Sequence, residues 1–230
     1  MTDRILPKAE KFASCPYDEK ILAFYEGQFE SVYVLLHPFL KPTKLAIDLF
    51  NPSTWPNKHE IINGCVPVTW AEILKLSGLQ SLSNIDVGLR TSIGGLSKDF
   101  ANSDFAEKLN DVADEHKIIH PTEGDIPPLL ENRLHRAIKE LGHNWLWVGD
   151  EFGRERKLHW IDDLIEKDEI PICGCVFTHD HSLLVTNHWD SHCSFLCASK
   201  ALVEKILAID DFEGFYCTPK TEVYWSVHEM

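Results

Sequence analysis

The stretch from residue 172 to residue 186 limits the fold of this chain more than any other part of its sequence. It begins with Ile172-Cys-Gly-Cys-Val-Phe-Thr178, continues through the polar turn His179-Asp-His-Ser182 and ends with Leu183-Leu-Val-Thr186. Apolar, β-branched and aromatic residues on both sides of a short polar turn are typical of two antiparallel strands joined in a hairpin. Similar runs predict further strands at residues 145–149, 194–198, 214–217 and 223–226.

Earlier in the chain the apolar residues follow the periodicity of helices. Thr69 and Glu72 have the spacing of a capping box, which starts a short helix at Trp70, and Gly78 provides its end. Further helices are expected at residues 17–29, 83–96, 103–116, 125–141, 158–166 and 199–209. Strands are expected at residues 31–37, a β-branched and aromatic run that Pro38 closes, and at residues 45–50.

Together these elements predict an α+β fold. A mostly helical region, residues 1–142, precedes an antiparallel β-rich region, residues 143–230, against which one or two helices pack. The two regions are either separate domains or parts of one continuous domain.

The net charge of −14 is spread unevenly along the 230 residues. Residues 1–100 hold 10 Lys and Arg against 11 Asp and Glu, whereas residues 101–230 hold 12 against 25. Two short helices between residues 70 and 96 have the outline of a helix-turn-helix, but the second offers only Arg90 and Lys98 as cations. Because cations neutralise the phosphates in nucleic-acid complexes, the charge argues against a nucleic-acid partner. It favours a protein partner with a basic or neutral surface, or serves solubility alone.

The location of the protein is indicated by its apolar and cysteine content. No run approaches the roughly 20 apolar residues that a membrane span requires, and the first eleven residues are rich in charge. Seven cysteines are an odd number without the regular spacing of a secreted disulfide scaffold. We therefore expect a cytoplasmic protein with no membrane partner.

Ligand-type side chains gather around the predicted hairpin and just after it: His179, His181, His188, Asp190 and His192. Residues two apart on a strand share a face, and a hairpin partner can bring the second group beside the first. Three such ligands and a water molecule would form a catalytic zinc site or a site for a related divalent metal. The alternative interpretation is two polar turns, since Asp and Ser are turn residues and His is tolerated there.

Five cysteines lie in the same part of the chain: Cys173, Cys175, Cys193, Cys197 and Cys217. Four thiolates can hold a structural zinc ion, but the usual spacing is C-x-x-C, not C-x-C. Buried small apolar residues explain them more simply. A nucleophilic cysteine paired with His192 is poorly supported, because neighbouring residues on a strand point to opposite faces.

The standard motifs of phosphate-binding loops, dinucleotide-binding folds, nucleophile elbows and HExxH zinc enzymes are all missing from the sequence. Whether the protein is an enzyme is left open. The leading hypothesis is a non-enzymatic binding or interaction protein, and the alternative is a metal-dependent enzyme built on the histidine cluster of residues 179–192.

Scattered segments of the chain resemble a known pattern. They are His188-Trp-Asp-Ser-His192, Phe195-Leu196, Phe212-Glu-Gly-Phe-Tyr-Cys217, Trp225 and, near the start, Leu35-Leu-His-Pro-Phe39. In this order they resemble a bacterial family of unknown function, domain of unknown function 2711. No established catalytic residues come with this family, so the resemblance assigns no role to these positions. Some proteins with similar C-terminal ends look like toxin-neutralising immunity proteins, which are small, acidic and cytosolic.

Overall fold

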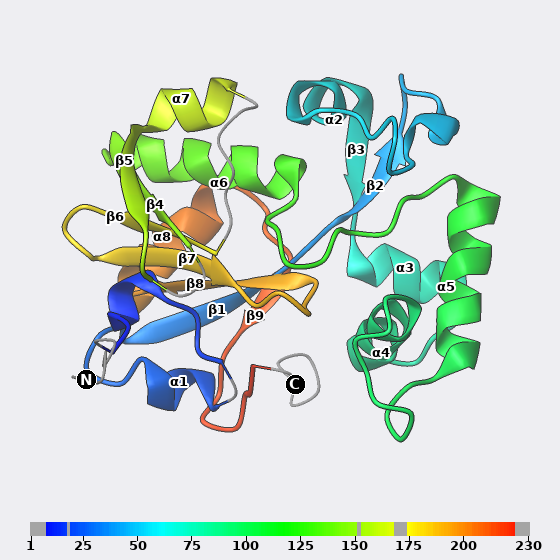
Figure 1. The fold of residues 1–230 in the computed structure, drawn as a ribbon, viewed down its shortest axis with the longest axis horizontal. Helices are drawn as coiled ribbons and strands as arrows, with labels where there is room; N and C mark the ends of the chain where they lie inside the picture. Colours follow the sequence, from blue (N-terminus) through cyan, green and yellow to red (C-terminus); the bar gives the residue numbers. More distant parts are fainter. Residues whose placement is uncertain (1–7, 18, 151–152, 168–173, 224–230) are drawn as a thin grey trace, which may run out of the picture.

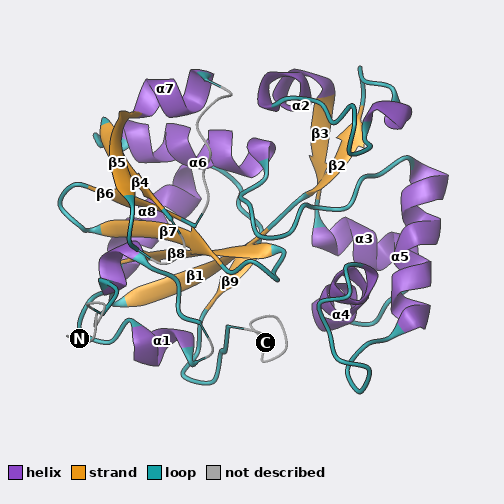
Figure 2. Cartoon of the chain, viewed as in Figure 1, coloured by secondary structure: helices purple, strands orange, loops and turns teal. Residues whose placement is uncertain are grey.

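The structure is a computed structural model that describes residues 8–17, 19–150, 153–167 and 174–223. Its central element is a seven-stranded antiparallel sheet (Figure 1). The strand order is β5-β4-β6-β7-β8-β1-β9. The strands are β1 (Ser31–Leu36), β4 (Trp145–Gly149), β5 (Arg156–Trp160), β6 (Cys175–Thr178), β7 (Leu183–Asn187), β8 (Cys193–Ala198) and β9 (Gly214–Tyr216). With the helices described below, the protein has the predicted α+β fold (Figure 2).

The predicted hairpin is confirmed as β6 and β7. Cys175 lies opposite Thr186, and Phe177 lies opposite Leu184. The turn between them is held by Asp180, whose carboxylate accepts hydrogen bonds from the Thr178 hydroxyl at 2.6 Å and from the hydroxyl and backbone N–H of the serine two residues on. The short polar side chains therefore close the hairpin locally.

The strand predicted near residue 31 is also confirmed, and it lies inside the sheet. β1 pairs with β8 on one side and with β9 on the other, so that Val34 lies between Phe195 and Phe215. All six of its residues are buried. The first region of the chain thus supplies a strand to the sheet of the second region, while the division at residue 142 stays a prediction.

Helices cover the sheet. On one face lie α6 (Pro128–Glu140), α7 (Ile161–Glu166) and α8 (Lys200–Ile209), whose apolar side chains form one core with Leu35 and the neighbouring strands (Figure 1). A second core contains Val34, Phe195 and residues of η1 (Lys11–Ala13) and α1 (Ile21–Phe24). No helix in the described part of the chain is long and apolar enough to cross a membrane.

Residues 39–120 form a separate layer beside the sheet, which we call the helical lobe (Figure 2). It contains β2 (Phe39–Pro42), η2 (Ile47–Leu49), α2 (Lys58–Gly64), β3 (Cys65–Val68), α3 (Trp70–Ser77), α4 (Leu82–Ser92) and α5 (Ser103–His116). Trp70, Leu89 and Leu109 of the lobe belong to the same apolar core as Val34 of the sheet. The lobe and the sheet therefore share buried surface.

Several predicted elements were wrong in extent or type. The first helix covers only residues 21–24, residues 45–50 contain the short η2 helix in place of a strand, and the helix expected from residue 158 begins at Ile161. Before Ile161 the chain continues β5, in which Trp160 lies opposite Trp145 and packs edge-to-face against it at 5.1 Å between ring centroids. Most of the strand expected at residues 223–226 lies outside the described residues.

Candidate ligand-binding site

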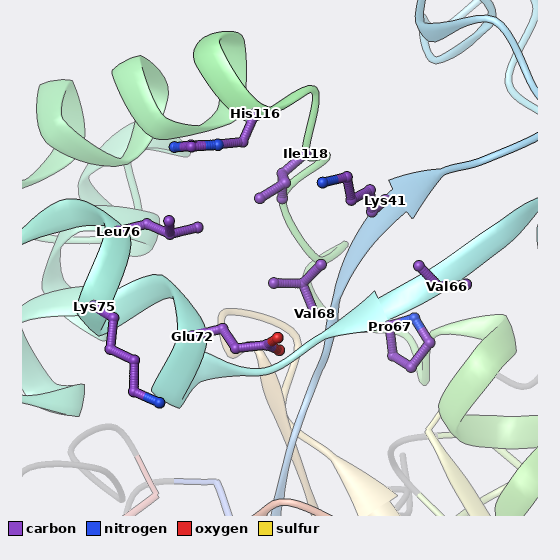
Figure 3. Close-up of a pocket in the computed structure, with 9 residues that line it drawn as sticks. All are labelled: Lys41, Val66, Pro67, Val68, Glu72, Lys75, Leu76, His116 and Ile118. Carbon is purple, nitrogen blue, oxygen red and sulfur yellow. The ribbon is translucent and has the colours of Figure 1, made fainter.

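A pocket of about 340 Å³ opens in the helical lobe between the two-stranded antiparallel sheet of β2 and β3, α3 and the end of α5 (Figure 3). It is lined by Lys41, Val66, Pro67, Val68, Glu72, Lys75, Leu76, His116 and Ile118. Five of the nine side chains are apolar. The pocket therefore combines an apolar surface with a small number of charges.

The pairing of β2 with β3 determines the position of one wall of the pocket. Phe39 lies opposite Val68, and Lys41 lies opposite Val66. Since alternate residues of a strand share a face, these four side chains lie on the same face of the two-stranded sheet. Phe39 and Val68 are buried toward the core, whereas Val66 remains 43% exposed at the pocket.

The second wall is a face of α3, and its local sequence determines where that helix begins. Thr69 and Glu72 form the predicted capping box: the Thr69 hydroxyl accepts from the Glu72 N–H, and the Glu72 carboxylate accepts from the Thr69 N–H at 2.8 Å. Glu72, Lys75 and Leu76 are three and four residues apart, so they follow one face of the helix. Leu76 is 43% exposed although it is apolar.

The third wall is the end of α5. The helix ends at His116, and the next residue, Lys117, adopts the left-handed conformation with φ 54° and donates its N–H to the Ala113 carbonyl. This cap turns the chain sharply. Ile118 is thereby directed into the lobe, and Ile119 pairs with Leu40 of β2.

Charges in the pocket are mostly positive. Hydrogen bonds from the backbone and the hydroxyl of Thr69 hold the pKa of Glu72 below its usual value, and the ammonium groups of Lys75 and Lys41 lower it further. Glu72 is therefore an anion at neutral pH. Figure 3 shows the Lys41 side chain extending over the pocket toward Ile118, while Lys75 points away from its centre.

The histidines predicted to form a metal site are divided between two turns. His179 and His181 lie in the turn before β7, and residues 188–192 follow its other end. Five strand residues separate the turns, a span of roughly 16 Å at about 3.3 Å per residue. His179 accepts a hydrogen bond from Trp147 Nε1, and His181 stacks on Phe12 at 3.7 Å between ring centroids. The structure therefore does not bring the two groups together.

The second group lies in a buried turn between β7 and β8. The Asp190 N–H donates to His188 Nδ1 at 3.3 Å, and the Ser191 hydroxyl donates to the His188 carbonyl. Burial lowers the pKa of His192 to about 3. Among the described residues no three His, Cys, Asp or Glu side chains are arranged to hold a metal ion. The metal site of residues 179–192 stays a prediction.

The cysteines of this part of the chain are buried or half-buried thiols. Cys175, Cys193 and Cys197 are at most 2% exposed, and Cys217 is partly buried against the same core. Burial raises the pKa of Cys175 to about 12, so that it is a thiol at neutral pH. Cys173 lies outside the described residues.

Sequence reasoning did not find the polar joint that connects the sheet with the helical lobe. His37, directly after β1, contacts the Ser194 hydroxyl through Nε2 at 2.7 Å, and its carbonyl accepts from Trp70 Nε1 at 2.7 Å. The Glu213 carboxylate accepts from the backbone N–H groups of Trp70 and Ala71, at 2.6 and 2.8 Å. We call these contacts the polar joint. It fixes the start of α3, and with it one wall of the pocket.

The fold and the pocket define an α+β protein with a ligand-sized site in a lobe beside its main sheet. The family described as "Protein of unknown function (DUF2711)" matches residues 17–227, and the chain belongs to it. The family predicted from the sequence is therefore confirmed. The chain is 21% identical over 174 residues to the uncharacterized protein YwbB of Bacillus subtilis (strain 168). These aligned residues cover 74% of this chain and 77% of YwbB. No solved structure matches the chain.

Proposed function

We propose that this protein is a non-enzymatic binding protein and that the pocket of the helical lobe is its ligand site. The observation that carries the proposal is the exposed apolar wall of the pocket. Val66 and Leu76 each leave 43% of their surface accessible in a volume of about 340 Å³. Ligand sites typically have volumes of roughly 300–1,000 Å³, mostly apolar walls and a few polar groups.

The polar side chains of the pocket support binding more than catalysis. Among the described residues that line it there is no serine, cysteine or aspartate; its one histidine is His116, and the carboxylate of Glu72 is used to cap α3. A general acid needs a proton near neutral pH, whereas the pKa of Glu72 is lowered. These groups suit the orientation of a ligand.

The charge of the chain supports a further part of the proposal. A net charge of −14 repels polyanions at long range and attracts cationic surfaces. Any macromolecular partner is therefore a protein with a basic or neutral surface, such as the basic toxin of an immunity pair, and not a nucleic acid. Cys65, Cys175, Cys197 and Cys217 form no disulfide bonds, which fits the reducing conditions of the cytoplasm.

The experiment measures binding of the neutral fluorescent probe N-phenyl-1-naphthylamine. The wild-type protein is expected to bind it saturably at one site. Leu76→Trp fills the pocket with a larger side chain and is expected to weaken binding by about tenfold, as loss of apolar contact of this size implies.

A matched control is Ile93→Trp, because Ile93 is 41% exposed at the end of α4 and does not line the pocket. It should bind the probe within about twofold of wild type, since the probe contacts are unchanged. Circular dichroism establishes that both variants fold. The proposal fails if the wild type shows no saturable binding or if folded Leu76→Trp binds as tightly as the control.

A further inference from the structure

The pocket has a charge opposite in sign to that of the whole chain. Its lining contains two lysines and one carboxylate, whereas the chain carries 36 Asp and Glu against 22 Lys and Arg. A net positive wall is therefore unusual for this protein. Local charge of one sign inside a concave site attracts ligands of the other sign.

Glu72 cannot reverse this preference, because one of its oxygens is already used. Oε2 accepts hydrogen bonds from both the backbone N–H and the hydroxyl of Thr69, each at 2.8 Å. Lys75 and Lys41 act on the same carboxylate and lower its pKa. The carboxylate is thus held at the start of α3 and its charge is offset by two ammonium groups.

Lys41 is the cation that remains available to a ligand. Its ammonium forms no hydrogen bond or ion pair with any residue that the structure describes. Its side chain lies on the same face of the β2–β3 sheet as Val66 and extends toward Ile118 (Figure 3). An ammonium that interacts with Glu72 only at longer range, without a hydrogen bond to it, therefore lies over an apolar surface.

We propose that the pocket binds a small organic acid. The carboxylate of the ligand contacts Nζ of Lys41, and its hydrocarbon body packs against Val66, Leu76 and Ile118. A carboxylate and an ammonium form a charge-assisted hydrogen bond, which is stronger than a bond between neutral groups. Lys75 adds attraction at longer range. This inference rests on the proposed function, since it names the ligand class of the same pocket.

The experiment compares two probes of nearly the same shape, the anion 2-naphthoate and the neutral 2-naphthamide. Each is titrated against the protein saturated with N-phenyl-1-naphthylamine, and its displacement of that dye is measured. Naphthoate is expected to displace the dye at about one tenth of the naphthamide concentration, the effect of one partly solvated charge-assisted hydrogen bond.

The variant Lys41→Gln tests the role of the ammonium. It replaces the ammonium with a neutral polar amide on a side chain one atom shorter, so the preference for naphthoate should fall to less than about threefold. Lys44→Gln is the matched control, because Lys44 is exposed three residues further on and does not line the pocket. The control should keep the tenfold preference.

The outcomes separate this inference from the proposed function. If the dye binds and Leu76→Trp weakens it, but naphthamide competes as well as naphthoate, the ligand is a neutral apolar molecule and only the inference is overturned. The inference alone is also overturned if Lys41→Gln keeps the preference for naphthoate, because another group then recognises the carboxylate, or if inorganic phosphate displaces the dye at the naphthoate concentration. If the dye does not bind at all, the proposed function itself fails.

Discussion

Acid should unfold this protein unusually early, because three histidines are buried in their neutral form. Burial lowers the pKa of His37, His135 and His192 to about 3. Glu131 lies 3.5 Å from His135, yet its carboxylate is already paired with Lys58 at 2.6 Å, so burial decides the pKa of this histidine. In the unfolded chain each histidine has a pKa near 6.5.

The sign of the effect follows from which state binds protons. Between about pH 6.5 and pH 3 the unfolded chain binds three protons that the folded chain does not, so stability decreases as the pH falls. From about pH 7.5 upward all three are nearly neutral in both states and contribute little pH dependence. At pH 5.5 each histidine costs about 1.4 kcal/mol, or about 4 kcal/mol together. Small proteins have a total stability of about 5–15 kcal/mol, so the loss is large.

The charges around His192 support this direction. Its charged or titratable neighbours are His37, Asp86, Arg90 and His120. The Arg90 guanidinium opposes its protonation, as His37 and His120 do when protonated, whereas Asp86 favours it but is outweighed by burial. Below about pH 5 carboxyl groups begin to bind protons as well. The pKa of Glu213, for example, is raised by burial. The measurement is therefore restricted to pH 7.5–5.5, where the histidines dominate.

The assay is urea unfolding followed by tryptophan fluorescence at pH 7.5, 6.5 and 5.5. His135→Gln removes one of the three buried groups and should reduce the loss between pH 7.5 and 5.5 by about 1.4 kcal/mol. His59→Gln, at an exposed position of α2, should leave the loss unchanged. A free energy of unfolding that varies by less than about 1 kcal/mol over this range would refute the reasoning.

Three further predictions concern packing, the polar joint and the predicted metal site. Gly88→Ala should lower the free energy of unfolding by about 1–2 kcal/mol in urea titration, because the added Cβ would lie 2.7 Å from Leu109 Cδ1. The control Gly95→Ala should be neutral or stabilising, because its Cβ would meet no atom closer than 3.4 Å. Glu213→Ala should cost about 1–3 kcal/mol in the same assay, since two amides at the start of α3 lose their acceptor. Elemental analysis of purified protein should find zinc, iron or manganese at one equivalent if residues 179–192 bind a divalent metal, and their absence would exclude that site.

Local signals in the sequence were sufficient for some elements. The β6–β7 hairpin was predicted correctly, because its polar turn and its strands are neighbours in sequence. The capping box of Thr69 and Glu72 was also predicted, since it is closed within four residues. β2 and β3 were not predicted: each contains a proline, Pro42 and Pro67, a residue that is normally found at the edges of sheets.

Other features depend on contacts that are distant in sequence. β5 was predicted as the start of a helix, and only its pairing with β4 identifies it as a strand. The expectation that a hairpin partner would bring the histidine groups together overlooked the length of β7, which places His179 and His188 at opposite ends. The pocket could not be predicted because its walls come from β2, β3, α3 and α5, and no motif connects these segments.

Polar groups that stabilise the fold already have hydrogen-bond partners within the protein, whereas a polar group that binds a ligand must be free to form a new hydrogen bond. Glu213 and Ser194 have partners within the polar joint, at distances of 2.6–2.8 Å. The buried carboxylate of Glu131 is likewise paired with an ammonium from α2. These groups hold the lobe against the sheet, and replacing one leaves its partner unsatisfied, which costs stability. Lys41 is exposed and lacks such a partner in the described part of the chain. Its replacement should therefore change ligand selectivity with little effect on folding, and this difference distinguishes a binding residue from a structural one.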